Sequence, residues 1–157
     1  MTLDLGEFNE IHPKEKETVG ERLALQAMWL VYGLYTKKRA FGPVFKDAVQ
    51  CGGELLVRFD CAEDGFEIRT NNIPGRTVSV VGDEKSTSTE NSSLLTSSAG
   101  FEIAGADRKF VPAEAVRDAG QKNVLWLSAE GVDKPVYARY CWTNFGEVNY
   151  FGKNGLP

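Results

Sequence analysis

The sequence predicts a mostly β fold in which one helix precedes an antiparallel β-sandwich. Apolar residues recur at helical spacing in the first part of the chain, and the pattern changes to alternation after Gly42-Pro43. Glycine-containing turns then separate several short alternating segments, as in β-sandwich domains. We therefore expect a helix over residues 14–36 and a sandwich over residues 43–157, with ends placed to within ~2–4 residues.

Pro13 marks the start of the predicted helix, because proline suits the first position of a helix. Glu15 and Glu17 follow in the first turn, where carboxylates favour the positive end of the helix dipole. A wide apolar stripe then follows at helical spacing: Val19, Leu23, Ala27, Leu30, Val31 and Leu34, with Leu25, Trp29 and Tyr32 beside it. Gly33 and the basic cluster 37–39 mark its end. So much apolar surface predicts either self-association or docking to a further structural unit.

The strands are predicted from period-two alternation. Residues 53–60 place Leu55, Val57 and Phe59 on one face, and residues 123–129 and 135–142 alternate in the same way. Shorter strands are expected at 76–82, 100–105 and 109–115, and a polar loop rich in Ser and Thr at 83–98.

Composition excludes several classes of function. The net charge of −4 and the pI near 5.1 argue against a nucleic-acid surface. The longest apolar run is too short to cross a bilayer, so no membrane partner is expected. No secretion signal opens the chain, which leaves the compartment open. The three cysteines, Cys51, Cys61 and Cys141, are best interpreted as half-buried small side chains, although Cys51 and Cys61 could face each other across neighbouring strands.

His12 is the only histidine, and it stands directly before Pro13. One histidine cannot build a multi-histidine metal site, and P-loop, GxGxxG, HExxH and GxSxG motifs are absent. A strand end, an acidic loop, a histidine and a helix start could present the imidazole as a base at the edge of an α/β sheet. Asp4, Glu7 or Glu10 could then orient the ring. The alternative is a solvated residue at a helix start.

The segment "DLGEFNEIHPKEKETVGERLALQAMWLVYG" resembles the end of the catalytic domain of sialate O-acetylesterases, which are SGNH-type hydrolases. The family carries a DLGE–(D/N)IHP–K–K–GxRLA pattern. Three downstream segments, at 41–60, 100–115 and 135–157, are similar to the β-rich carboxyl-terminal region of the same enzymes. The resemblance covers nearly all of the chain except residues 70–98.

The resemblance implies two domains. Residues 1–42 would be the last strand end, histidine loop and helix of a flavodoxin-like α/β hydrolase domain, and residues 43–157 a carboxyl-terminal antiparallel β-sandwich. Family members carry their nucleophilic serine far upstream, in a Gly-Gln-Ser-Asn-type turn that this sequence does not contain. The chain therefore looks like the carboxyl-terminal third of a longer enzyme, and alone it is expected to be inactive.

The resemblance also assigns roles. His12 matches the catalytic base. Glu10 is implied as its acidic partner, because Asn9 occupies the position where the wider group often has Asp. A backbone carbonyl that orients the ring is the alternative to Glu10. The implied reaction removes acetyl from an O-acetylated sialic acid or a related acetylated sugar, without metal or organic cofactor. The missing amino-terminal α/β portion is the implied partner, and a secreted or periplasmic enzyme is suggested.

A rival interpretation is a stand-alone β-sandwich that binds carbohydrate without catalysis. Aromatic side chains suited to stacking on sugar rings are Trp126, Trp142, Tyr137, Tyr140, Phe145 and Tyr150. Their alternation along strands favours core packing for these rings.

Overall fold

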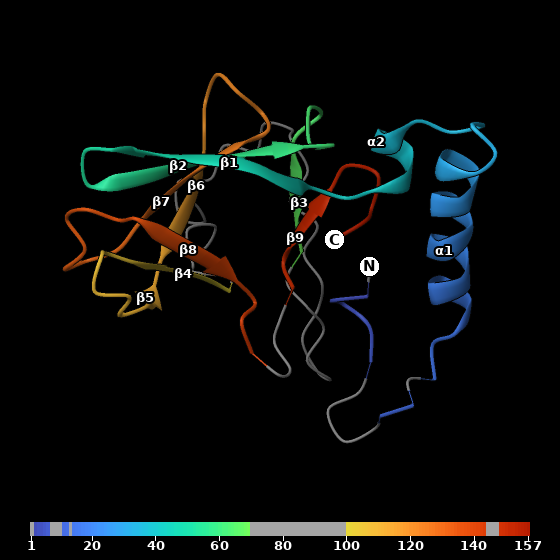
Figure 1. Ribbon diagram of the computed structural model, residues 1–157, viewed down its shortest axis with the longest axis horizontal. Coiled ribbons are helices and arrows are strands. Elements are labelled where there is room, and N and C mark those ends of the chain that lie inside the picture. The colour runs from blue at the N-terminus through green and yellow to red at the C-terminus, as the bar shows by residue number, and fades with distance from the viewer. Residues whose placement is uncertain (1, 7–10, 13, 70–99, 144–147) are drawn as a thin grey trace, which may run out of the picture.

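The computed structural model describes residues 2–6, 11–12, 14–69, 100–143 and 148–157. Two helices come first, α1 (Glu17–Leu30) and α2 (Lys37–Ala40), and strands follow them. The strands are β1 (Val44–Cys51), β2 (Glu54–Asp60), β3 (Phe66–Ile68), β4 (Phe101–Ala104), β5 (Val111–Pro112), β6 (Glu114–Arg117), β7 (Val124–Ser128), β8 (Tyr137–Tyr140) and β9 (Tyr150–Gly152). Figure 1 shows α1 at one side of the sheets, with α2 near the start of β1.

The described strands form three antiparallel sheets. Their orders are β1-β2-β7-β6, β5-β4-β8 and β3-β9. The β1–β2 hairpin turns at Gly52-Gly53, and its register shifts once, between Phe45 and Asp47. The predicted mostly β, antiparallel class is confirmed, and within the described residues no helix lies beyond residue 43. The strands divide into three sheets, and the smallest consists of β3 and β9, which pair only with each other.

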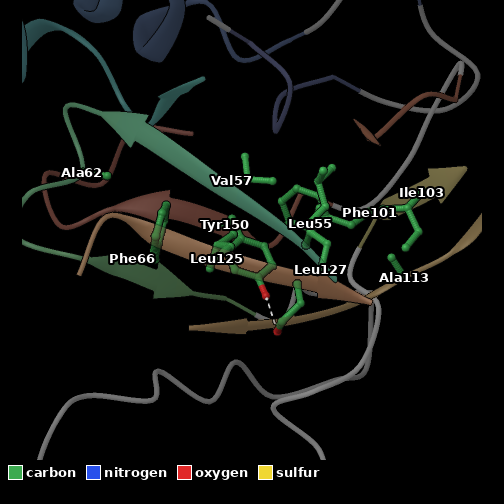
Figure 2. Close-up of a cluster of buried hydrophobic side chains, with 11 residues drawn as sticks. Leu55, Val57, Ala62, Phe66, Phe101, Ile103, Ala113, Leu125, Leu127 and Tyr150 are labelled. Carbon is green, nitrogen blue, oxygen red and sulfur yellow. Dashed lines mark hydrogen bonds between the residues drawn. The ribbon is translucent and has the colours of Figure 1, made fainter. Parts of the chain in front are cut away.

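One apolar core is shared by all three sheets. β2 and β7 contribute Leu55 and Leu127, while the other two sheets contribute Ile103 and Phe66. Tyr150 lies among these side chains, as Figure 2 shows. Its hydroxyl donates to the carbonyl of Ala115 at 3.4 Å. Burying one such large apolar side chain stabilises the fold by about 1.5–3 kcal/mol. The β part of the chain therefore closes its own core.

The helix is shorter than predicted. It spans residues 17–30 instead of 14–36, because Gly33 takes a left-handed φ of 63° that ends the helical path. The basic cluster then forms the separate short helix α2. Within the described part of the chain, no helix is long and apolar enough to span a membrane.

The strands predicted at 53–60, 100–105, 123–129 and 135–142 correspond to β2, β4, β7 and β8. The segment 109–115 divides into β5 and β6, and β1, β3 and β9 had not been predicted from alternation. Cys51 and Cys61 do not face each other, because they lie at opposite ends of the β1–β2 hairpin. The strand expected at 76–82 and the loop at 83–98 lie outside the described residues.

The carboxyl-terminal residues brace the helices against the sheets. The side-chain amide of Asn154 donates to the carbonyl of Lys38, within α2, at 2.8 Å and to that of Phe41, directly after α2, at 2.7 Å. Gly42 lies directly against the backbone oxygens of Leu156 and Pro157, where a Cβ would overlap them. The chain can cross from helix to sheet here only because Gly42 has no side chain.

We predict opposite effects for two Gly→Ala substitutions. Gly42→Ala should destabilise the protein by about 1–3 kcal/mol, because the added methyl group meets backbone atoms of Leu156 and Pro157 instead of a flexible side chain. Gly20→Ala, inside α1 with open space around it, should stabilise the helix by roughly 0.5–1 kcal/mol. Urea unfolding measures both. Equal stability of the two variants would contradict the packing described at Gly42.

Candidate active site

His12 is exposed and lies shortly before α1, where the sequence placed it. Its neighbours Pro13 and Glu10 lie outside the described residues, as does Glu7, so the proposed pairing of Glu10 with the imidazole stays a prediction. An exposed imidazole at a chain segment before a helix is accessible to a second molecule or domain. This is a position from which a base can act on a group supplied from elsewhere.

Asp4 has a different partner from the one considered for it. Its two carboxylate oxygens accept hydrogen bonds from Arg22, at 2.6 Å and 2.7 Å. The side chains are 13% and 10% exposed, so the pair is largely removed from water. The hydrogen bond to Asp4 raises the pKa of the Arg22 guanidinium further, which keeps the pair charged. The structure thus assigns Asp4 to Arg22, a contact that sequence reasoning missed.

The start of α1 is fixed by Glu15. Lys16 stands at the N-cap position without a side-chain hydrogen bond, and the Glu15 carboxylate accepts instead from the backbone N–H of Thr18 at 3.1 Å and from its hydroxyl at 3.0 Å. These bonds lower the pKa of Glu15. One otherwise unsatisfied helix donor is thereby bound, and the carboxylate stands at the positive end of the helix dipole.

The apolar face of α1 and the turn after it is exposed. Leu23 is 61% exposed, Leu30 71%, Val31 71% and Leu34 68%, while Arg22 is the buried residue of the helix. On its inner side α1 contacts the rest of the chain through Trp29, whose ring meets Phe41 edge-on at 5.2 Å. The prediction that part of this stripe would be exposed is confirmed. Such a patch is typical of an interface.

No activated nucleophile is found among the described residues. Ser128 is the one serine in that part of the chain, and it lies within β7 paired with Glu114 instead of on a turn. Burial raises the pKa of the Cys61 and Cys141 thiols, which is the opposite of what a nucleophilic thiolate requires. The described residues also contain no cluster of three or more His, Cys, Asp or Glu side chains that could hold a metal ion.

The aromatic residues divide between core and surface. Tyr150 is buried and Tyr140 partly buried, and the Tyr140 hydroxyl accepts the backbone N–H groups of Asn149 and Tyr150, so core packing is confirmed for these two. Trp142 is 71% exposed and Tyr137 36%, so the core interpretation was wrong for them. Phe145 lies outside the described residues.

Trp126 lies on the outer face of the four-stranded sheet. It is the third member of a cross-strand row that runs Val49, Leu56, Trp126 and Val116. Its indole N–H donates to Asp118 at 2.8 Å, which fixes the ring and lowers the pKa of that carboxyl. Leu125 and Leu127, which point to the other face of β7, belong to the core cluster, whereas Trp126 is only partly buried.

Comparison with known proteins identifies one informative neighbour. No protein-family model matches the chain, and no curated protein matches it. Among solved structures, the chain is similar to a carbohydrate acetylesterase from Xanthomonas citri, with a TM-score of 0.71 and 30% sequence identity. The match covers 98% of this chain and 29% of that chain, so this chain spans less than a third of its neighbour's length. The finding supports a carbohydrate esterase relationship.

We predict that the chain on its own associates through the exposed stripe of α1. Sedimentation velocity over increasing concentration should show a rising average mass, and the double variant Leu30→Glu and Val31→Glu should remain monomeric, because charges there oppose burial of the stripe. Val136→Glu, at a site 51% exposed on the β part, is the matched control and should associate like the unmodified chain. A monomer at every concentration would contradict the prediction.

Proposed function

We propose that this chain is the carboxyl-terminal part of a carbohydrate O-acetylesterase, in which residues 1–42 complete an α/β catalytic domain and residues 43–157 form the terminal β domain. The observation that carries the proposal is the match of 98% of the chain to 29% of the chain of a carbohydrate acetylesterase, at 30% identity. The DLGE and IHP motifs refine the proposed substrate to an O-acetylated sialic acid or a related acetylated sugar.

The proposed reaction is acyl transfer through serine and histidine. A serine hydroxyl attacks the acetyl carbonyl while the imidazole of His12 takes the hydroxyl proton. The imidazolium then gives this proton to the departing sugar oxygen, which leaves an acetyl-enzyme. In the second half the imidazole takes a proton from water while the water oxygen attacks the acetyl carbonyl. The imidazolium then returns this proton to the departing serine oxygen, which releases acetate and restores the free serine. Donors aimed at the developing oxyanion would stabilise both transition states.

In this proposal the nucleophile comes from an α/β portion that docks on α1. The described residues supply no serine on a turn, whereas Leu30, Val31 and Leu34 offer an exposed apolar stripe in the same amino-terminal region as His12. Covering the stripe with a complementary apolar surface would yield roughly 25 cal/mol for each Å² removed from water. Docking would thereby place the imidazole beside the serine. Glu10 remains the proposed partner of the imidazole N–H.

We predict that His12→Ala removes catalysis without unfolding the protein. In the chain combined with its α/β portion, the rate of acetate release from an O-acetylated sialic acid should fall by about 10²–10⁴-fold, the usual contribution of a general base. Thermal melting should change little, because His12 is exposed. Glu21→Ala, an exposed change on α1, is the control and should keep full activity. Retained turnover in His12→Ala would refute the assignment of the base.

A second candidate is a carbohydrate-binding module without catalysis, and the exposure of Trp142 together with the Trp126 row favours considering it. By analogy with aromatic pairs, stacking of a sugar on an indole is expected to contribute about 0.5–1.5 kcal/mol. If binding is the function, Trp142→Ala or Trp126→Ala should weaken sugar binding in calorimetry about tenfold, and His12→Ala should not. Unchanged sugar binding in both Trp142→Ala and Trp126→Ala would reject this candidate.

A further inference from the structure

At the ion pair of Asp4 and Arg22, the usual arrangement of a surface helix is reversed: the charged side chain is buried and its apolar neighbour is exposed. Arg22 is 8% exposed over the whole residue, whereas Leu23, the next residue in α1, is 61% exposed. Charged residues are rarely buried unless they are paired. The burial of Arg22 therefore reflects a specific contact, and that contact reaches back to the beginning of the described chain.

The geometry of the pair is directional. Two nitrogens of the guanidinium donate to two oxygens of the same carboxylate, at 2.6 Å and 2.7 Å. A planar fork of this kind fixes the orientation of both side chains as well as their distance, and lysine cannot reproduce it. Because both side chains are largely shielded from water, salt screens the attraction only weakly.

The pair encloses the segment that carries His12. Asp4 precedes and Arg22 follows the histidine, and the two are 18 residues apart. Glu15, through its bonds to Thr18, fixes the helix start between them. Asp4, before His12, and Glu15, after it, are thus both bound to residues of α1. Closing a segment at its ends removes conformations that it would otherwise sample.

We propose that Asp4 and Arg22 are a positioning pair, which holds His12 where the nucleophile of the docked α/β portion reaches it. The significance of that location rests on the proposed function, but the restraint itself is a property of this chain. Neither residue touches the reacting atoms. Their effect passes through the position of the imidazole, so loss of the pair should impair turnover more than substrate binding.

The restraint is measurable in this chain alone, because its single histidine gives an unambiguous NMR signal. With the pair intact, the backbone N–H of His12 should show an order parameter near 0.85, and in Arg22→Met or Asp4→Asn it should fall below about 0.6. Arg22→Lys should fall between these values, since it keeps the charge and loses the fork. Melting of the β core in each sample verifies that the sheets remain folded.

Arg139→Met is the matched control, because Arg139 makes an equally bidentate pair with Glu102 at 2.7 Å and 3.1 Å inside the β part. It should leave the order parameter of His12 unchanged. A low value already present in the unmodified chain, or equal values in the unmodified chain and Arg22→Met, would overturn the positioning role.

Activity provides the second arm. In the chain combined with its α/β portion, Arg22→Met should lower kcat about tenfold or more with little change in KM, and Arg22→Lys should recover part of the loss. A change in KM as large as the fall in kcat, or an unchanged kcat, would overturn the role of the pair in positioning His12 for turnover. If the unmodified combination releases no acetate, the proposed function fails while the NMR result still decides whether the restraint exists.

Discussion

The helices and the sheets are held together where the carboxyl-terminal residues pack on Gly42. Asn154 binds the carbonyls of Lys38 and Phe41, so the end of α2 is fixed to the segment that follows β9. The ring of Phe41 contacts Trp29, and through this contact the direction of α1 is set as well. Lys38 adds an ion pair to Asp64, beyond the end of β2. The location of the amino-terminal region relative to the sheets depends on this junction.

The two parts of the chain differ in how completely they satisfy their apolar surface. Leu125, Leu127 and Ile103 are fully buried, so the sheets need nothing further to close their core. Leu30 and Val31 are mostly exposed, although aliphatic side chains of this size belong to the residues most often buried. The β part also exposes large apolar side chains, Phe45 and Trp142 among them, but the exposed group of Leu30, Val31 and Leu34 lies in the same amino-terminal region as His12.

The sequence predicted what alternation encodes, and it failed where a pattern was absent. β2 and β7 were found because Leu55, Val57, Leu125 and Leu127 alternate with less buried residues. β1 is an edge strand with a register shift and mostly exposed residues, so it has no alternation to detect, and β3 and β9 are three residues long. His12 was found because it is a lone imidazole. The Asp4–Arg22 pair was not, since a partner 18 residues away leaves no local signal.

In the proposed enzyme, whose base and nucleophile would lie on different structural units, these restraints together address one difficulty. A base acts only within hydrogen-bond reach of the proton that it removes, and a misplacement of about 1 Å can cost on the order of 10²-fold in rate. The position of His12 then depends on a series of contacts. Gly42 and Asn154 set the direction of α1, and the ion pair of Arg22 fixes the segment before the helix to that same helix. The exposed stripe of α1 supplies the surface on which a second unit can dock. In the proposed enzyme each of these contacts lies outside the reacting atoms, so we expect a substitution in any of them to change turnover through distance rather than through the chemistry of the imidazole.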